Sequence, residues 1–123
     1  MHKFKELIVW QKGMNLVKEI YGIARSFPDN ELFGITSQMK RSAISIPSNI
    51  AEGCGRNTDK ELNHFLNIAN GSSFELETLV ILSFDLGYLK QEEFNFLDSL
   101  LDEIQKMIYG FKQSIQTKSS PRS

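Results

Sequence analysis

The sequence predicts an all-α protein, a single domain that folds as an antiparallel up-down-up-down four-helix bundle. Apolar residues recur at intervals of three and four through nearly the whole chain, and the two-residue alternation typical of strands is almost absent. Glycine, proline and asparagine interrupt this pattern only briefly, and short connections make successive helices antiparallel neighbours. We therefore expect a bundle of residues 1–117 with helices at about 5–26, 34–54, 58–86 and 91–116.

The first predicted helix has a wide apolar face made of two adjacent rows. One row contains Leu7, Trp10, Met14, Val17, Tyr21 and Ala24, and the other contains Val9, Leu16, Ile20, Ile23 and Phe27. Pro28 disfavours helical backbone at the residue before it, and Asp29 with Asn30 is typical of a turn. The helix should therefore end near Ser26.

The second predicted helix carries an apolar stripe beside a polar one. The apolar stripe is Ile35, Met39, Ala43, Ile46, Ile50 and Cys54, and the polar stripe is Gln38, Arg41, Ser45, Asn49, Glu52 and Arg56. Pro47 lacks a backbone donor and crowds the carbonyl of Ala43, so we expect a bend there. Gly53 and Gly55 are expected to end the helix with left-handed backbone.

The third and fourth helices are predicted by their ends as well as by their period. Thr58 and Glu61 have the spacing of a capping box, and Gly87 is a natural C-terminal stop. Gly71 lies in the middle of the third helix, where small residues usually let a neighbouring backbone approach. The fourth helix follows from the row Phe94, Leu97, Leu101, Ile104, Ile108, Phe111 and Ile115, and residues 118–123 are expected to be a disordered tail.

The short link between the second and third helices predicts which of their residues lie level with each other. The expected pairs are Arg41 with Glu75, Gln38 with Glu77, and Ser45 with Asn70 and Gly71. The polar stripe thus faces a polar patch on the third helix, and Arg41 with Glu75 is a candidate ion pair. We interpret five residues as a structural polar network or, alternatively, a site: Gln38, Arg41, Asn49, Glu52 and Glu75.

The charge is small overall but unevenly distributed. With a net charge of −1 and a pI near 6.1, the chain has no general positive field that would attract nucleic acid or anionic lipid. The segment up to Phe27 nevertheless has five basic and two acidic residues, whereas 58–87 has one basic and five acidic residues. These opposite charges, with surplus apolar helix surface, predict a head-to-tail oligomer. A possible basic binding face comprises Lys12, Lys18, Arg25, Lys40 and Arg56.

Motifs for catalysis, metals and cofactors are weak. Ser37 and Lys40 have the S-x-x-K spacing of serine acyl-enzymes, but the companion S-D-N and K-T-G motifs are absent from the sequence. The two histidines have no Cys or acidic partner at metal-ligand spacing. We expect no catalytic residue, no metal and no cofactor. The single Cys54 and the lack of an apolar leader or of a run of ~18 apolar residues predict a cytoplasmic protein with no membrane partner.

Several motifs resemble a known bacterial family over nearly the whole chain. They are ELIVWQKGMNLVKEIY, FPDNELFGITSQMKRSAISIPSNIAEG and FLNIANGSSFELETLVILSFDLGYL. The sequence is similar to the four-helix bundle family first noticed in intervening sequences of 23S rRNA genes. The resemblance implies antiparallel bundles that assemble as homopentamers. It also implies a distant relation to the accessory variability protein of diversity-generating retroelements, which is strongly basic, so its role is not transferred to this slightly acidic chain.

The favoured hypothesis is a non-enzymatic homo-oligomeric scaffold, pentameric by resemblance, that binds another macromolecule. RNA or an RNA-associated protein is the expected partner class, because several weakly binding faces on one assembly would gain avidity together. One alternative is a small enzyme with a polar site between the second and third helices. Another alternative is a protein-only adaptor.

Overall fold

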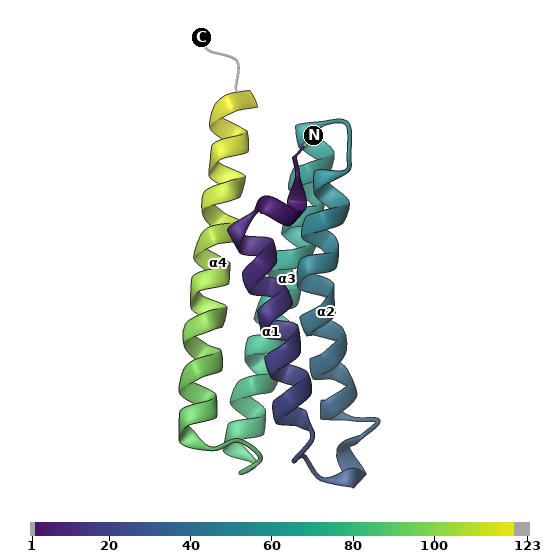
Figure 1. The fold of residues 1–123 in the computed structure, drawn as a ribbon, viewed down its shortest axis with the longest axis vertical. Coiled ribbons are helices and arrows are strands. Elements are labelled where there is room, and N and C mark those ends of the chain that lie inside the picture. The colour runs from purple at the N-terminus through teal and green to yellow at the C-terminus, as the bar shows by residue number, and fades with distance from the viewer. Residues whose placement is uncertain (1, 120–123) are drawn as a thin grey trace.

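The structure, a computed structural model, describes residues 2–119, with the side chains of 2–116. The described chain is all-α, with four long helices and short connections (Figure 1). The elements are η1 (Phe4–Glu6), α1 (Ile8–Ala24), η2 (Asp29–Glu31), α2 (Ile35–Cys54), α3 (Asp59–Asp85) and α4 (Gln91–Ser119), where η marks a 3-10 helix. The predicted fold class is confirmed.

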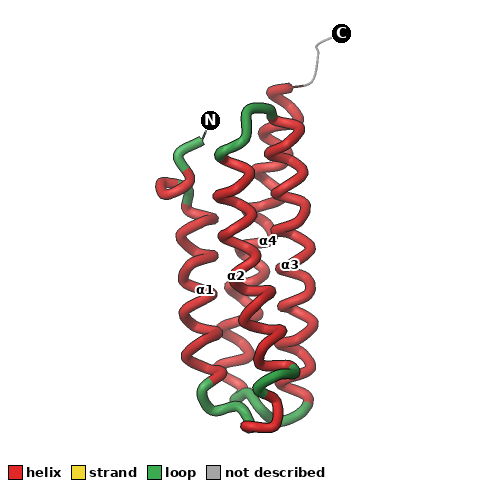
Figure 2. The backbone as a smooth tube through the Cα atoms, turned by 90° about the vertical axis from the view of Figure 1, so that its right-hand side faces the viewer, coloured by secondary structure: helices red, strands yellow, loops and turns green. Residues whose placement is uncertain are grey.

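The four helices form an up-down-up-down bundle in which each long helix packs beside two others. Both α1 and α3 contact α2 and α4, but they do not contact each other (Figures 1 and 2). The contact between α2 and α3 is the most extensive, and the contact between α1 and α4 is the smallest. Because α1 and α3 are diagonal to each other, their outward faces point to different sides of the bundle.

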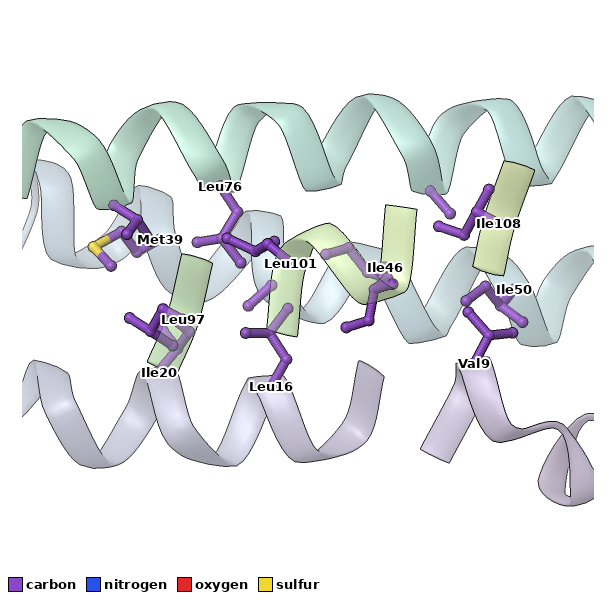
Figure 3. Close-up of a cluster of buried hydrophobic side chains, with 14 of the residues drawn as sticks. Val9, Leu16, Ile20, Met39, Ile46, Ile50, Leu76, Leu97, Leu101 and Ile108 are labelled. Atoms are coloured by element: carbon purple, nitrogen blue, oxygen red, sulfur yellow. The ribbon is translucent and has the colours of Figure 1, made fainter. Parts of the chain in front are cut away.

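The core runs along the middle of the bundle and takes side chains from all four helices (Figure 3). Its large, fully buried members are Leu16, Ile20, Met39, Ile46, Ile50, Leu66, Leu76, Val80, Leu97, Leu101, Ile104 and Ile108. Each such side chain contributes roughly 1.5–3 kcal/mol through removal from water. Of the two apolar rows predicted on the first helix, the row with Leu16 and Ile20 enters the core. Met14 and Tyr21, from the other row, stay exposed.

Small residues let α2 and α3 pack closely. Ala43 and Ser42 of α2 and Ala69 and Ser73 of α3 are buried. At Gly53 a Cβ atom would lie only 2.9 Å from Leu62 Cδ1 and 3.0 Å from Phe65 Cβ, so a side chain there would force atoms of α3 to move. Gly53 therefore serves close packing.

The predicted left-handed end of the second helix is wrong. Gly53 lies inside α2, and the C-cap Gly55 has right-handed backbone with φ −86°. In the described chain only Gly87 has a positive φ, 82°, and it follows the C-cap of α3 as predicted. Steric packing against α3 explains Gly53, whereas conformational freedom explains Gly87.

Pro47 lies inside α2, and the helix continues through it to Cys54. Its ring is buried against α1, where Gly13 leaves room: a Cβ atom at residue 13 would lie 3.4 Å from the Pro47 Cβ. Pro47 thus lacks one helical hydrogen bond but makes a close contact between α1 and α2.

The predicted helix ends differ from the observed ones by a few residues. α1 begins at Ile8 because Leu7 has extended backbone after η1. Thr58 caps α3 as predicted, since Glu61 N–H donates to Thr58 Oγ1 at 3.1 Å. α4 continues to Ser119, into the predicted tail, whose residues 120–123 lie outside the described part of the chain. Among the described residues, no helix has the length and apolar character needed to cross a membrane.

Candidate functional site

A polar hollow lies between α2 and α3, with a volume of about 360 Å³. The α2–α3 hollow, as we call it, is lined by Gln38, Arg41, Ser42, Ser45, Ser72 and Glu75. The Ser45 and Ser72 hydroxyl oxygens, one from each helix, are 2.7 Å apart and hydrogen-bonded. Ser45 therefore meets Ser72, one residue beyond the Gly71 that the turn length predicted.

Asn49 extends this hydrogen-bonded group along α2. Its side-chain amide donates to the carbonyl of Ser45 at 2.8 Å and to Ser45 Oγ at 2.9 Å. The Asn49 amide is thereby bound to its own helix near Pro47, which is the structural role that the sequence suggested. Asn49, Ser45 and Ser72 form one partly buried network that joins the two helices.

Arg41 and Glu75 line the same hollow but are not paired with each other. Both side chains are exposed, and no ion pair between them is found in the described chain. The predicted Arg41–Glu75 ion pair is therefore absent. Glu77, predicted opposite Gln38, instead accepts a hydrogen bond from Gln105 of α4 at 2.8 Å. The level of the residues was predicted well, but the direction of these two carboxylates was not.

Glu52 belongs to a separate surface group at the end of α2. Its carboxylate pairs with Arg56 at 3.0 Å across one helical turn, and the Arg56 guanidinium lies 4.8 Å from the centre of the Phe65 ring. Pairs of this exposed kind contribute roughly 0–1 kcal/mol. The five residues interpreted as one network thus divide into the hollow with Asn49 and a distinct helix-end pair.

The predicted basic residues are spread along the bundle. Lys12 pairs with Glu103 of α4 at 3.2 Å, whereas Lys40 lies 4.8 Å from the centre of the Tyr21 ring. Arg25 lies near Lys40, beside the loop that follows α1. Arg56 is 16 residues from Lys40, or about 24 Å along the helix axis. A ligand that contacts all of them would have to be long or span several subunits.

An apolar groove follows the contact between α1 and α2 and has a volume of about 400 Å³. The α1–α2 groove is lined by Phe4, Trp10, Met14, Val17, Ile44, Pro47, Ser48 and Ala51. Trp10, Met14 and Val17 belong to the outer apolar row of the first helix, in which Trp10 and Val17 pack against the core but stay partly buried and Met14 is exposed. Sequence reasoning missed Ile44, which is 41% exposed, because it lies outside the apolar stripe of its helix.

The outward face of α3 carries a second apolar surface, made of Phe74, Ile81 and Leu82. These side chains, which we call the α3 ridge, are 51%, 42% and 46% exposed. Gly71 lies one turn before Phe74, and no heavy atom lies within 4 Å of a Cβ built there, apart from the local helix backbone. The bundle itself therefore supplies no packing reason for this apolar surface or for its glycine.

The described residues hold no group of three or more His, Cys, Asp or Glu side chains arranged to bind a metal ion. Cys54 is buried at the end of α2, and burial raises the pKa of its thiol. Tyr88, after Gly87, donates a hydrogen bond to Glu31 Oε2 at 2.8 Å. That bond raises the pKa of Tyr88, with burial and the nearby carboxylate charge adding to the effect.

The fold and these surfaces define an all-α protein with a small polar hollow, an apolar groove and an exposed apolar ridge. The chain belongs to the 23S rRNA-intervening sequence protein family, which it matches over residues 5–110. It is also similar to the crystal structure of a protein of unknown function from the S23 ribosomal protein family of Bacteroides thetaiotaomicron VPI-5482. The TM-score is 0.80 at 23% identity, over 85% of this chain and 98% of that one. No curated protein sequence matches.

Proposed function

We propose that the protein is a non-enzymatic homo-oligomeric scaffold that binds another macromolecule, with RNA or an RNA-associated protein as the partner. The observation that carries the oligomer is apolar surface that the single bundle leaves exposed, including the α1–α2 groove and the α3 ridge. Contiguous exposed apolar surface on a small protein commonly marks an interaction site. A homopentamer is the assembly that the family resemblance favours.

RNA is the favoured partner for two reasons. The family description refers to intervening sequences of 23S rRNA, and the segment up to Phe27 is the basic part of the chain. Lys18 and Arg25 are exposed on or beside α1 and have no partner among the ion pairs of the described chain. One subunit offers few such charges. Repetition of the same charges around a ring would add weak phosphate contacts together and so give avidity. We expect the protein to bind its partner in the cytoplasm and to need no cofactor.

Fluorescence anisotropy with a structured RNA and a matched DNA duplex, at ~50 and ~200 mM salt, tests the partner. RNA binding that weakens steeply over this interval is the expected result, because released counterions drive phosphate contacts. A Lys18→Gln, Arg25→Gln variant should bind less tightly, with Lys106→Gln as a control because Lys106 pairs with Asp102 on α4. Absence of RNA binding at the lower salt would contradict the proposal and favour a protein-only adaptor.

A second candidate is a small enzyme that uses the α2–α3 hollow. The observation that favours it is that Arg41 and Glu75, neither of which belongs to an ion pair of the described chain, line one hollow about one turn from the Ser45–Ser72 hydroxyl pair. An arginine and a carboxylate that line one polar hollow could orient a small polar molecule. Chemical-shift perturbation of the Arg41 and Glu75 side chains by a panel of small metabolites, lost in Glu75→Gln, would support this function. An unresponsive hollow would exclude it.

A further inference from the structure

We propose that the α3 ridge of one copy docks into the α1–α2 groove of a second copy, so that the chain assembles head to tail. This inference deepens the proposed function and rests on its homo-oligomer. The occupant of the groove is the α3 ridge of a second copy of the chain, so each contact joins two different surfaces.

The groove offers an apolar surface of suitable length. Trp10 and Val17 on α1 are seven residues apart, as are Ile44 and Ala51 on α2, so each pair spans two turns or about 10.5 Å. Met14 lies between the members of the first pair and is 36% exposed. The floor is closed by Pro47, so the groove is a depression between two helices rather than a passage into the core.

The α3 ridge has the same spacing. Phe74 and Ile81 are also seven residues apart on one helix, and Leu82 broadens the ridge beside Ile81. An aromatic and an aliphatic side chain two turns apart match a groove whose walls repeat at two turns, which is how helices pack side chains into the spaces of a neighbour. Their exposure in a single copy leaves about half of each side chain available to a partner.

Gly71 leaves open space on the outward face of α3, as Gly22 does on α1 and Gly110 does on α4. A glycine in a helix interior costs about 1 kcal/mol relative to alanine, and within the subunit nothing approaches this position. Gly53, by contrast, has Leu62 and Phe65 against it. A second copy that packs on the outward face of α3 would use the space that Gly71 leaves beside Phe74.

The charges favour this pairing over a contact between like surfaces. The segment up to Phe27 has three more basic than acidic residues, and 58–87 has four more acidic than basic residues. Lys18 and Arg25 are exposed on the first segment, and Glu75 and Asp85 are exposed on the second. Contact between two α3 faces would bring acidic residues together, whereas contact between α3 and α1 brings opposite charges together.

The position of the two surfaces makes the assembly cyclic or open-ended. Because α1 and α3 are diagonal in the bundle (Figures 1 and 2), one copy can use both surfaces at once. A contact between two different surfaces generates a ring when its rotation closes and a filament when it does not. A ring of the kind expected for this chain requires such a contact.

The test uses the full chain and two surface variants, with molar mass measured by sedimentation velocity. The ridge variant is Phe74→Ser with Ile81→Ser, and the groove variant is Met14→Asp with Ile44→Ser. Each should weaken self-association by about 30-fold or more, as for the loss of interface hot spots. A Phe96→Ser, Tyr109→Ser variant is the matched control, because both side chains are comparably exposed on α4. Circular dichroism should show all three variants to be folded.

Mixing the ridge variant with the groove variant gives the sharpest result. The ridge variant keeps an intact groove and the groove variant keeps an intact ridge, so the mixture should form a one-to-one dimer and nothing larger. If the ridge instead contacts another ridge, the groove variant will assemble normally and the mixture will form no such dimer. That outcome would overturn the inference.

The remaining outcomes separate this inference from the proposed function. A wild-type chain that oligomerises while both surface variants also oligomerise would contradict the proposed contact and leave the scaffold intact. A wild-type chain that stays monomeric up to millimolar concentration would contradict both.

Discussion

The hydroxyl oxygens of Ser45 and Ser72 lie 2.7 Å apart and join α2 to α3 across a partly buried contact. Ser45 also accepts a hydrogen bond from the Asn49 amide, so one hydroxyl links two helices and a neighbouring turn. The surrounding contact is made of small residues such as Ala43 and Ala69. The closest helix pair of the bundle therefore combines tight packing with a short polar connection.

Replacement of Ser72 by alanine should lower the free energy of unfolding by about 1 kcal/mol, because it removes one net hydrogen bond. The Ser45 hydroxyl would keep Asn49 as a partner, so the loss should stay at this modest level. Urea denaturation of Ser45→Ala, Ser72→Ala and the double variant measures the coupling between the two residues. Strictly additive losses would show that the hydroxyl contact contributes nothing.

Gly53→Ala should destabilise the bundle by about 1–3 kcal/mol, because the new methyl group overpacks the contact with α3. Its Cβ would lie 2.9 Å from Leu62 Cδ1 and 3.2 Å from the Leu62 carbonyl oxygen, and the backbone atom cannot easily move. Gly110→Ala is the control, since open space surrounds Gly110 and alanine favours helix there. Thermal melts should move in opposite directions. A Gly53→Ala chain as stable as the wild type would contradict the steric role.

Ala69→Arg should unfold the bundle, because Ala69 is fully buried where α2 meets α3 and an arginine there would bury an unpaired charge. Asn67→Arg is the control, since residue 67 is exposed on the same helix. Far-ultraviolet circular dichroism should show helix loss in the first variant only. A soluble and fully helical Ala69→Arg protein would mean that the assigned face of α3 is wrong.

The hydrogen bond from Tyr88 to Glu31 should contribute a part of the free energy of unfolding that is lost at alkaline pH. It raises the pKa of Tyr88 in the folded state above 10.0, so its contribution is present below pH 10 and is lost as the pH rises through the raised value. Tyr88→Phe removes this contribution. Urea melts of both proteins should differ at pH 8 and converge as the pH rises above 10. A difference that grows above pH 10 would show the opposite sign.

The sequence predicted the helices well because their signals are local. The three-four spacing, the Thr58 cap and the Gly87 stop each depend on residues within one or two turns. The level of Ser45 against α3 was predicted to within one residue, since the short link restricts the register. Ser45 was expected beside Gly71 and meets Ser72.

The missed features depend on geometry between helices. Arg41 and Glu75 are level, but long exposed side chains are directed by solvent as much as by a partner, so no pair forms. Gly53 looked like a helix stop, whereas its role depends on Leu62, which lies on another helix. Ile44 lines a groove that exists only once α1 is in place.

The uneven helix contacts have a consequence for how the chain folds. α2 and α3 are joined by a short link and share the most extensive contact, so their pairing costs little loop-closure entropy. We expect this helical hairpin to form early and α1 to dock later. Hydrogen exchange should then be faster in α1 than in α2, and equal protection would contradict this order. Because one wall of the α1–α2 groove is α1 itself, the groove is complete only after α1 has docked. Self-association through this groove would therefore follow the folding of each chain.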